Sequence, residues 1–160
     1  MNVFLSYAIG LADGPIPARL RAVAAAYNIS ILLPDRTGPH TLTAETLAKI
    51  RQSDAVIALV TRTAQIESVN LVNAELAGAA TAQKPVIALI EQGVSLQPAA
   101  NTSIVYFDRF NPTAHESSLM TALERIRLEK WKQDLTALGW IAGIALGLIA
   151  LSQLIGDDKQ

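Results

Sequence analysis

The fold is decided by one stretch of the chain, residues 53–90, which reads SDAVIALVTRTAQIESVNLVNAELAGAATAQKPVIALI. It contains an unbroken apolar run at residues 55–60 and ends with a second one at residues 86–90. Such runs, rich in valine and isoleucine, are typical of strands buried on both faces of a parallel sheet. Between them, residues 68–83 carry apolar side chains at helical spacing. The stretch therefore predicts a right-handed strand–helix–strand unit.

The same alternation continues on both sides of this unit. Further apolar runs predict strands at residues 3–7, 29–33 and 103–107. Further segments predict helices at residues 17–27, 43–52 and 112–132. Thr43 is the predicted cap of the helix that follows it. Together these elements predict an α/β fold, a five-stranded parallel sheet with helices on both faces.

Composition excludes several classes of protein. The chain has 160 residues, 51% of them hydrophobic and 17% charged, which is enough for one folded domain and excludes a disordered chain. It has no cysteine and two histidines, so a disulfide framework, a cysteine nucleophile and a multi-histidine zinc site are excluded. A formal net charge of −1 argues against a surface built to hold nucleic acid. We expect no bound metal and no nucleic-acid partner.

The end of the chain has a different character. Residues 135–156 read LTALGWIAGIALGLIALSQLIG and carry no charge. As a helix, 22 residues rise about 33 Å, and the hydrocarbon core of a bilayer is about 30 Å thick. We expect a domain at residues 1–130, a juxtamembrane segment at 131–134, a transmembrane helix at 135–156 and a polar tail at 157–160. The alternative is a C-terminal helix buried against the soluble domain.

Basic residues flank the two ends of this apolar segment unequally. Four precede it and one follows it: Arg125, Arg127, Lys130 and Lys132 on one side, Lys159 on the other. The positive-inside rule then predicts a single-pass protein of the inner (cell) membrane, with residues 1–133 in the cytoplasm.

Three glycines lie four residues apart within the segment, at Gly139, Gly143 and Gly147. Small residues at this spacing let two membrane helices approach closely. The pattern predicts a homo-oligomer held together through these helices, although glycine is also common in membrane helices generally.

A ligand site is expected at one edge of the predicted sheet, because open α/β sheets bind ligands beyond the carboxyl ends of their strands. The loops at that edge are residues 8–16, 34–42, 61–67 and 91–102. None contains a GxGxxG or a Walker A pattern, which disfavours a Rossmann dehydrogenase and a P-loop NTPase.

Several segments resemble TIR (Toll/interleukin-1 receptor) domains of the bacterial type. Val3–Tyr7, which ends in Ser-Tyr, resembles the opening strand of that family, and residues 34–39 resemble the BB loop after its second strand. Residues 50–61 and 84–90 resemble its third and fourth strands. Ser68–Leu76 resembles its Ser-x-x-Trp-x-x-x-Glu-Leu helix, with Leu71 in place of the aromatic residue. Over residues 1–130 the resemblance implies a TIR-like, flavodoxin-like fold.

The resemblance also implies an activity. TIR enzymes break the N-glycosidic bond between nicotinamide and ribose in NAD, and their catalytic glutamate corresponds to Glu75. The expected function is a membrane-anchored TIR-like effector of antiviral defence or signalling, an NAD hydrolase or cyclase. NAD is then a substrate, and no cofactor is expected.

The residues themselves support a site around Glu75. Ser68, Leu71 and Glu75 are spaced i, i+3 and i+7 and share one helix face. A carboxylate there would stabilise positive charge on a ribose whose N-glycosidic bond is breaking; the alternative is a solvated helix residue. The other substrate-binding candidates end two strands or follow them: Ser6, Tyr7, Asp35 and Arg36. Asp35 and Arg36 would clamp a phosphate or sugar, or simply form a turn.

Two other functions remain open. A non-catalytic TIR-like module would sense a nucleotide or bind a partner and cluster the membrane helices, and Leu71 favours it. A nucleoside deoxyribosyltransferase-like enzyme would share the parallel sheet and use its glutamate as a nucleophile.

Overall fold

The structure is a computed structural model of the chain. It describes residues 1–26, 28–36, 41–97, 99, 102–111 and 141–151. The elements in chain order are β1 (Asn2–Ala8), η1 (Leu11–Asp13, a 3-10 helix), α1 (Ile16–Ala26), β2 (Ser30–Leu32), α2 (Ala44–Gln52), β3 (Ala55–Val60), α3 (Ile66–Thr81), β4 (Val86–Glu91) and β5 (Thr102–Phe107). Residues 141–151 form a further helix. The helix predicted at residues 112–132 lies outside the described residues.

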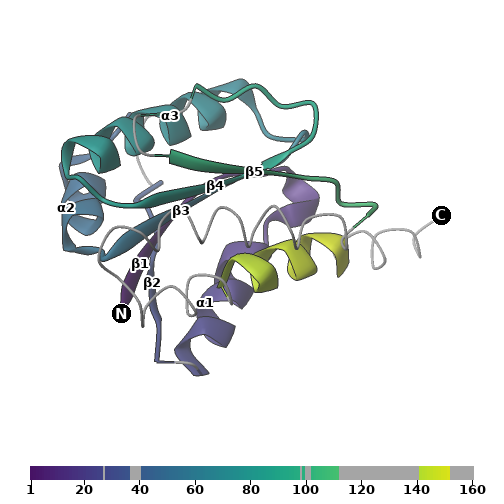
Figure 1. Cartoon of the computed structure of the whole chain (residues 1–160), viewed down its shortest axis with the longest axis horizontal. Coiled ribbons are helices and arrows are strands. Elements are labelled where there is room, and N and C mark those ends of the chain that lie inside the picture. The colour runs from purple at the N-terminus through teal and green to yellow at the C-terminus, as the bar shows by residue number, and fades with distance from the viewer. Residues whose placement is uncertain (27, 37–40, 98, 100–101, 112–140, 152–160) are drawn as a thin grey trace.

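The five strands form one parallel sheet in the order β2-β1-β3-β4-β5. This is the order of flavodoxin-like folds, and it confirms the predicted α/β architecture. Helices α2 and α3 cover one face of the sheet, and α1 and the helix of residues 141–151 cover the other (Figure 1).

Two hydrophobic cores lie on the two faces because successive side chains of a strand point to opposite sides. In β1, Leu5 packs in the core beneath α1, whereas Phe4 packs in the core beneath α3. Every residue of β3 and of β4 is buried. Burial on both faces explains why these strands read as continuous apolar runs and why the sequence located them well.

Helix α2 begins as its sequence predicts. The hydroxyl of Thr43 accepts a hydrogen bond from the backbone N–H of Thr46 at 3.1 Å, which confirms Thr43 as the cap. The hydroxyl of Thr46 in turn accepts the backbone N–H of Asp35 at 3.0 Å. The start of this helix therefore also holds the segment that follows β2.

Helix α3 begins and ends two residues earlier than predicted. Its first residue is Ile66, and Gln65 precedes it in an extended conformation. Gln83, the predicted last residue, has a φ of 54°. This left-handed conformation is incompatible with a continuing helix, so α3 has ended by that point.

The described part of the apolar C-terminal segment packs on the domain. Ile141, Ala145 and Ile149 are almost fully buried in the same core as Leu5. Among the described residues, no helix is both long enough and apolar enough to cross a bilayer. Over residues 141–151 the structure thus shows a helix packed on the α/β domain. The remainder of the predicted span lies outside the described residues.

The glycines of this helix face away from the domain. Gly143 and Gly147 are exposed, and no heavy atom lies within 4 Å of the position that a Cβ atom would take at either one. Gly139 lies outside the described residues. The face that the sequence analysis assigned to helix association is therefore turned outward.

Candidate functional site

Four of the predicted site residues meet at the carboxyl edge of the sheet, around the carboxylate of Glu75. The Ser6 hydroxyl donates to Glu75 Oε2 at 2.5 Å. Arg36 Nη1 lies 2.9 Å from Glu75 Oε1, and Arg36 Nη2 donates to Oε2 at 3.3 Å. The fourth residue, Tyr7, contacts Arg36.

The alternation of side chains along β1 places Ser6 toward α3. Phe4 and Ala8, which flank it at a spacing of two, both belong to the core on that side. A hydroxyl buried in such a core needs a hydrogen-bond partner. Glu75 supplies it from the inner face of α3, where Val72 and Leu76 are also buried.

Tyr7 and the start of α2 hold Arg36 over the carboxylate. The guanidinium lies 5.4 Å from the centre of the Tyr7 ring, within the range of a cation–π contact. Arg36 Nη2 also donates to the carbonyl oxygen of Tyr7 at 3.2 Å. The neighbouring Asp35 is held by Thr46, as described above. Arg36 is therefore anchored on several sides, and the interpretation of this segment as a plain turn is incomplete.

Glu75 is a buried carboxyl group, and its burial disfavours the charged form. Its residue is 1% exposed. Burial raises the pKa of Glu75 above its ordinary value, and the Arg36 charge and the hydrogen bonds from Ser6 and Arg36 offset only part of that rise. The interpretation of Glu75 as a solvated helix residue is wrong. A perturbed carboxyl at the carboxyl edge of a parallel sheet is a feature of functional sites.

The raised pKa of Glu75 leads to a stability prediction for Glu75→Gln. Between pH 4.5, the ordinary carboxyl value, and the raised pKa, the folded protein holds a proton that the unfolded chain has released. The stability of the wild type therefore falls as pH rises through this window. Glutamine does not titrate, so the variant should gain stability relative to the wild type as pH rises from 4.5 through the raised pKa of Glu75.

Urea unfolding of both proteins at a series of pH values measures this difference. Glu67→Gln is the matched control, because Glu67 is an exposed glutamate of the same helix. A difference that moves in favour of the wild type as pH rises would mean that Arg36 and Ser6 outweigh burial.

The other predicted residues lie around this centre with less direct contact. Leu71 is buried one helical turn before Glu75, and Ser68 is half-buried nearer the start of α3. Asp35 donates its backbone N–H to Thr46. The structure thus brings together Ser6, Tyr7, Arg36 and Glu75, and leaves the roles of Ser68, Leu71 and Asp35 as predictions.

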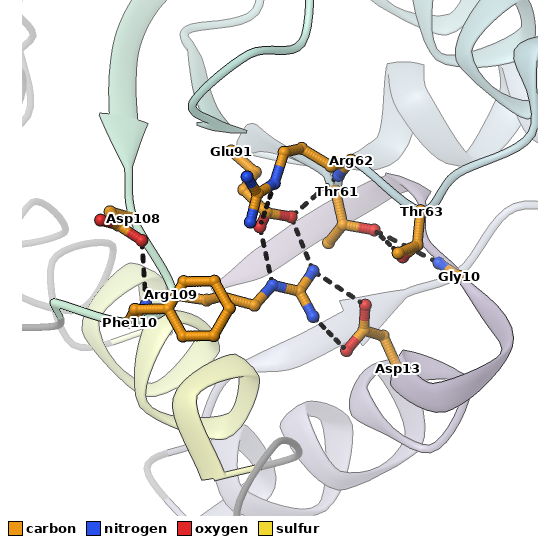
Figure 2. Close-up of polar contacts among 9 residues, drawn as sticks. All are labelled: Gly10, Asp13, Thr61, Arg62, Thr63, Glu91, Asp108, Arg109 and Phe110. Carbon is orange, nitrogen blue, oxygen red and sulfur yellow. Dashed lines mark hydrogen bonds and ion pairs between the residues drawn. The ribbon is translucent and has the colours of Figure 1, made fainter. Parts of the chain in front are cut away.

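A second polar cluster, which the sequence analysis did not predict, lies at the same edge of the sheet (Figure 2). Arg109 forms two short hydrogen bonds with Glu91, from Nε at 2.7 Å and from Nη2 at 2.6 Å. Arg109 also reaches Asp13, with Nη2 lying 3.2 Å from Oδ2. Arg62 donates to Glu91 from its backbone N–H at 2.8 Å and from Nε at 3.0 Å.

This cluster joins the ends of four strands. Asp13 follows β1, Arg62 follows β3, Glu91 ends β4 and Arg109 follows β5. Burial alone would raise the pKa of Glu91, but the hydrogen bonds and charge of Arg109 and the bonds from Arg62 outweigh it and hold that pKa below its ordinary value. The hydrogen bond to Glu91 leads the contacts that raise the pKa of Arg109. Glu91 and Arg109 therefore remain ionised and paired, which suits the cluster to fastening the loops beside the site.

A sequence signal for this cluster did exist. Glu91 directly follows five apolar residues of a strand buried on both faces, and Arg109 comes two residues after β5. Charges so close to buried strands usually need partners.

Among the residues that the structure describes, no three histidine, cysteine, aspartate or glutamate side chains are grouped so that they could hold a metal ion. Comparison of the chain with protein-family models, with curated proteins and with solved structures found no match.

Proposed function

We propose that this chain cleaves the N-glycosidic bond between nicotinamide and ribose in NAD, with Glu75 as the catalytic carboxylate. One observation carries the proposal: a buried carboxyl group lies at the carboxyl edge of a parallel sheet, held by Ser6 and by an arginine from the loop after β2. The resemblance of residues 1–130 to TIR domains supports the choice of NAD.

The chemistry requires a negative charge at this place. As the bond breaks, nicotinamide leaves with the bonding electron pair and becomes neutral, and the positive charge passes to the ribose. The Glu75 carboxylate stabilises that charge. Water then attacks the anomeric carbon and loses a proton, which gives ADP-ribose; attack by a group of the same molecule gives a cyclic product.

Arg36 has to move for substrate to reach Glu75. The Glu75 side chain is 1% exposed, and Arg36 pairs with it from a side chain that is 25% exposed. Once displaced, a guanidinium presents a planar fork of donors that suits the diphosphate of NAD. In this proposal Arg36 covers the carboxylate in the free protein and binds phosphate in the complex. Ser6, Tyr7, Asp35, Ser68 and Leu71 line the remainder of the substrate site.

The proposal includes a membrane anchor. Residues 135–156 span the cell membrane as a single helix, with residues 1–133 in the cytoplasm, and Gly139, Gly143 and Gly147 bring the helices of several copies together. The lack of charge over these residues and the outward-facing Gly143 and Gly147 support this arrangement. The resemblance to bacterial TIR domains supports a role in antiviral defence or signalling.

The test is incubation of the full chain with NAD, clustered in detergent or in liposomes, followed by chromatography of the products. We expect release of nicotinamide together with ADP-ribose or a cyclic nucleotide. No loss of NAD from the clustered wild type would favour the non-catalytic TIR-like module. Two observations fit that candidate: Arg36 covers Glu75, and Leu71 replaces the family's aromatic residue. Exchange of bases on a deoxyribonucleoside would instead indicate the deoxyribosyltransferase activity.

The glycine row leads to a prediction about self-association. Gly143→Ile plus Gly147→Ile should leave membrane insertion intact, because isoleucine is at least as apolar as glycine. The double variant should lose cross-linked dimers in detergent, because branched side chains hold the helix backbones apart. Ser152→Ile, which adds the same side chain outside the glycine row, is the control. Undiminished cross-linking of the double variant would show that the glycine row is incidental.

A further inference from the structure

The helix of residues 141–151 has two competing assignments, as part of a membrane span and as part of the domain core. It occupies the middle of the proposed transmembrane segment, residues 135–156, and it also belongs to the core beneath the sheet. Its five most buried side chains are between 0% and 8% exposed. They are Ile141, Ala142, Ala145, Leu146 and Ile149. The same side chains cannot contact the sheet and lipid at the same time.

This helix covers apolar residues of the sheet. The core that it joins contains Leu5, Ile57, Leu89 and Phe107, which come from four different strands and are each at most 1% exposed. In Figure 1 the helix, in yellow, runs beside α1 beneath the sheet. If the helix enters a bilayer, some of this surface loses its cover. Release of the helix from the sheet therefore costs its contacts with the sheet and gains contacts with lipid. Either partner removes the apolar side chains of the helix from water.

We propose that residues 141–151 have two alternative positions, docked on the sheet or inserted in the membrane, and that a lipid bilayer competes with the sheet for the helix. The inference rests on the membrane anchor proposed above and does not depend on NAD cleavage. It predicts that insertion uncovers the sheet face on which residues 141–151 pack, including Val105 and Phe107 of β5. The chain thereby changes its own surface when it enters a membrane.

Cysteine labelling can distinguish the two positions, because the chain has no cysteine of its own. Three single variants of the full chain are needed: Gly143→Cys on the outer side of the helix, Val105→Cys on β5 beneath it, and Gln52→Cys as an exposed control on α2. Val105 is 0% exposed and belongs to the same core as the helix, whereas positions 143 and 52 are exposed. The probe is a water-soluble maleimide, used with and without liposomes of phosphatidylethanolamine and phosphatidylglycerol.

Without liposomes, we expect positions 143 and 52 to react and position 105 to be protected. With liposomes, position 143 should become protected and position 105 should react, each rate changing by about tenfold or more, while position 52 stays unchanged. Protection of position 143 while position 105 stays protected would overturn the competition but leave the anchor standing. Reaction of position 143 at an unchanged rate would overturn the anchor and the competition together. Nicotinamide release, measured in the same samples, reports on the proposed activity separately.

A pair of phenylalanine variants tests the competition in a second way. Phe107→Leu weakens the core that holds the helix and leaves the helix sequence unchanged, so it should lower the lipid concentration needed for half-maximal insertion by about 5-fold to 30-fold. Phe4→Leu is the matched control, because Phe4 is as deeply buried but lies in the core on the opposite face. Equal lipid requirements for Phe107→Leu and the wild type, or equal shifts in both variants, would contradict the proposal.

Discussion

Glu75→Gln should abolish the cleavage of NAD while the protein stays folded. Glutamine keeps the shape of the side chain and can still accept a hydrogen bond from Ser6. It removes the negative charge that stabilises the positive charge on the ribose as the bond breaks. Loss of one such electrostatic contact in a buried site costs about 10²–10³ in rate. The measurement is nicotinamide release by the full chain, clustered in detergent or liposomes, with circular dichroism as the test of folding.

Glu67→Gln makes this experiment specific. Both glutamates lie on α3, and Glu67 is exposed in its first turn. Glu67→Gln makes the same chemical change and should retain the rate of the wild type. Equal rates for Glu75→Gln and the wild type would exclude Glu75 as the catalytic carboxylate.

Arg109→Met should lower the free energy of unfolding by about 3–5 kcal/mol, the usual cost of removing one partner from a buried ion pair. The variant leaves Glu91 without its two shortest side-chain hydrogen bonds and Asp13 without its guanidinium partner. Both carboxylates are at most 1% exposed, so water cannot easily replace the missing partner. Urea unfolding followed by circular dichroism measures the difference.

Arg62→Met is the control for the second arginine of the cluster. Its side chain is 49% exposed, and its backbone N–H still donates to Glu91 after the substitution. The expected loss is therefore about 1 kcal/mol or less. Similar losses in the two variants would show that burial does not decide the strength of these pairs.

The pH dependence of this cluster has the opposite sign to that of Glu75. The pKa of Glu91 is lowered in the folded protein, so its contribution to stability is present above the ordinary carboxyl value of 4.5 and is lost as pH falls through the lower pKa. The advantage of the wild type over Arg109→Met should accordingly shrink in acid. At the Glu75 site, by contrast, stability falls as pH rises.

The sequence predicted the strands well because burial leaves a local pattern. The runs at residues 55–60 and 86–90 are apolar at every position, as strands buried on both faces require, and the observed bounds of β3 are the predicted ones. The meeting of Ser6, Arg36 and Glu75 at one edge also followed from topology, because the carboxyl ends of parallel strands and the loops after them share that edge. The direct pairing of Arg36 with Glu75 did not follow, since it depends on the Tyr7 ring and on the hydrogen bond from Asp35 to Thr46.

For two other features the sequence indicated burial but not the partner. Asp13 and Arg109 are 96 residues apart, and no local periodicity connects charges at such a separation. The C-terminal helix posed a different problem, because a lipid bilayer and the face of a sheet both select apolar side chains. Hydrophobicity indicated that residues 141–151 leave water, and it could not indicate which partner they join.

The helix that packs on β5 comes more than 30 residues after β5 in the sequence, and this order matters during protein synthesis. Ribosomes add about 5–20 residues per second, so the roughly 40 residues between Phe107 and Leu151 take about 2–9 s to make. For that time the newly made sheet lacks the cover that residues 141–151 will provide. The nascent chain therefore passes through a period in which chaperones, neighbouring nascent chains and the membrane insertion machinery can all meet an open apolar surface. The last helix can choose between the sheet and a bilayer only after this interval, when residues 141–151 have themselves been made and released.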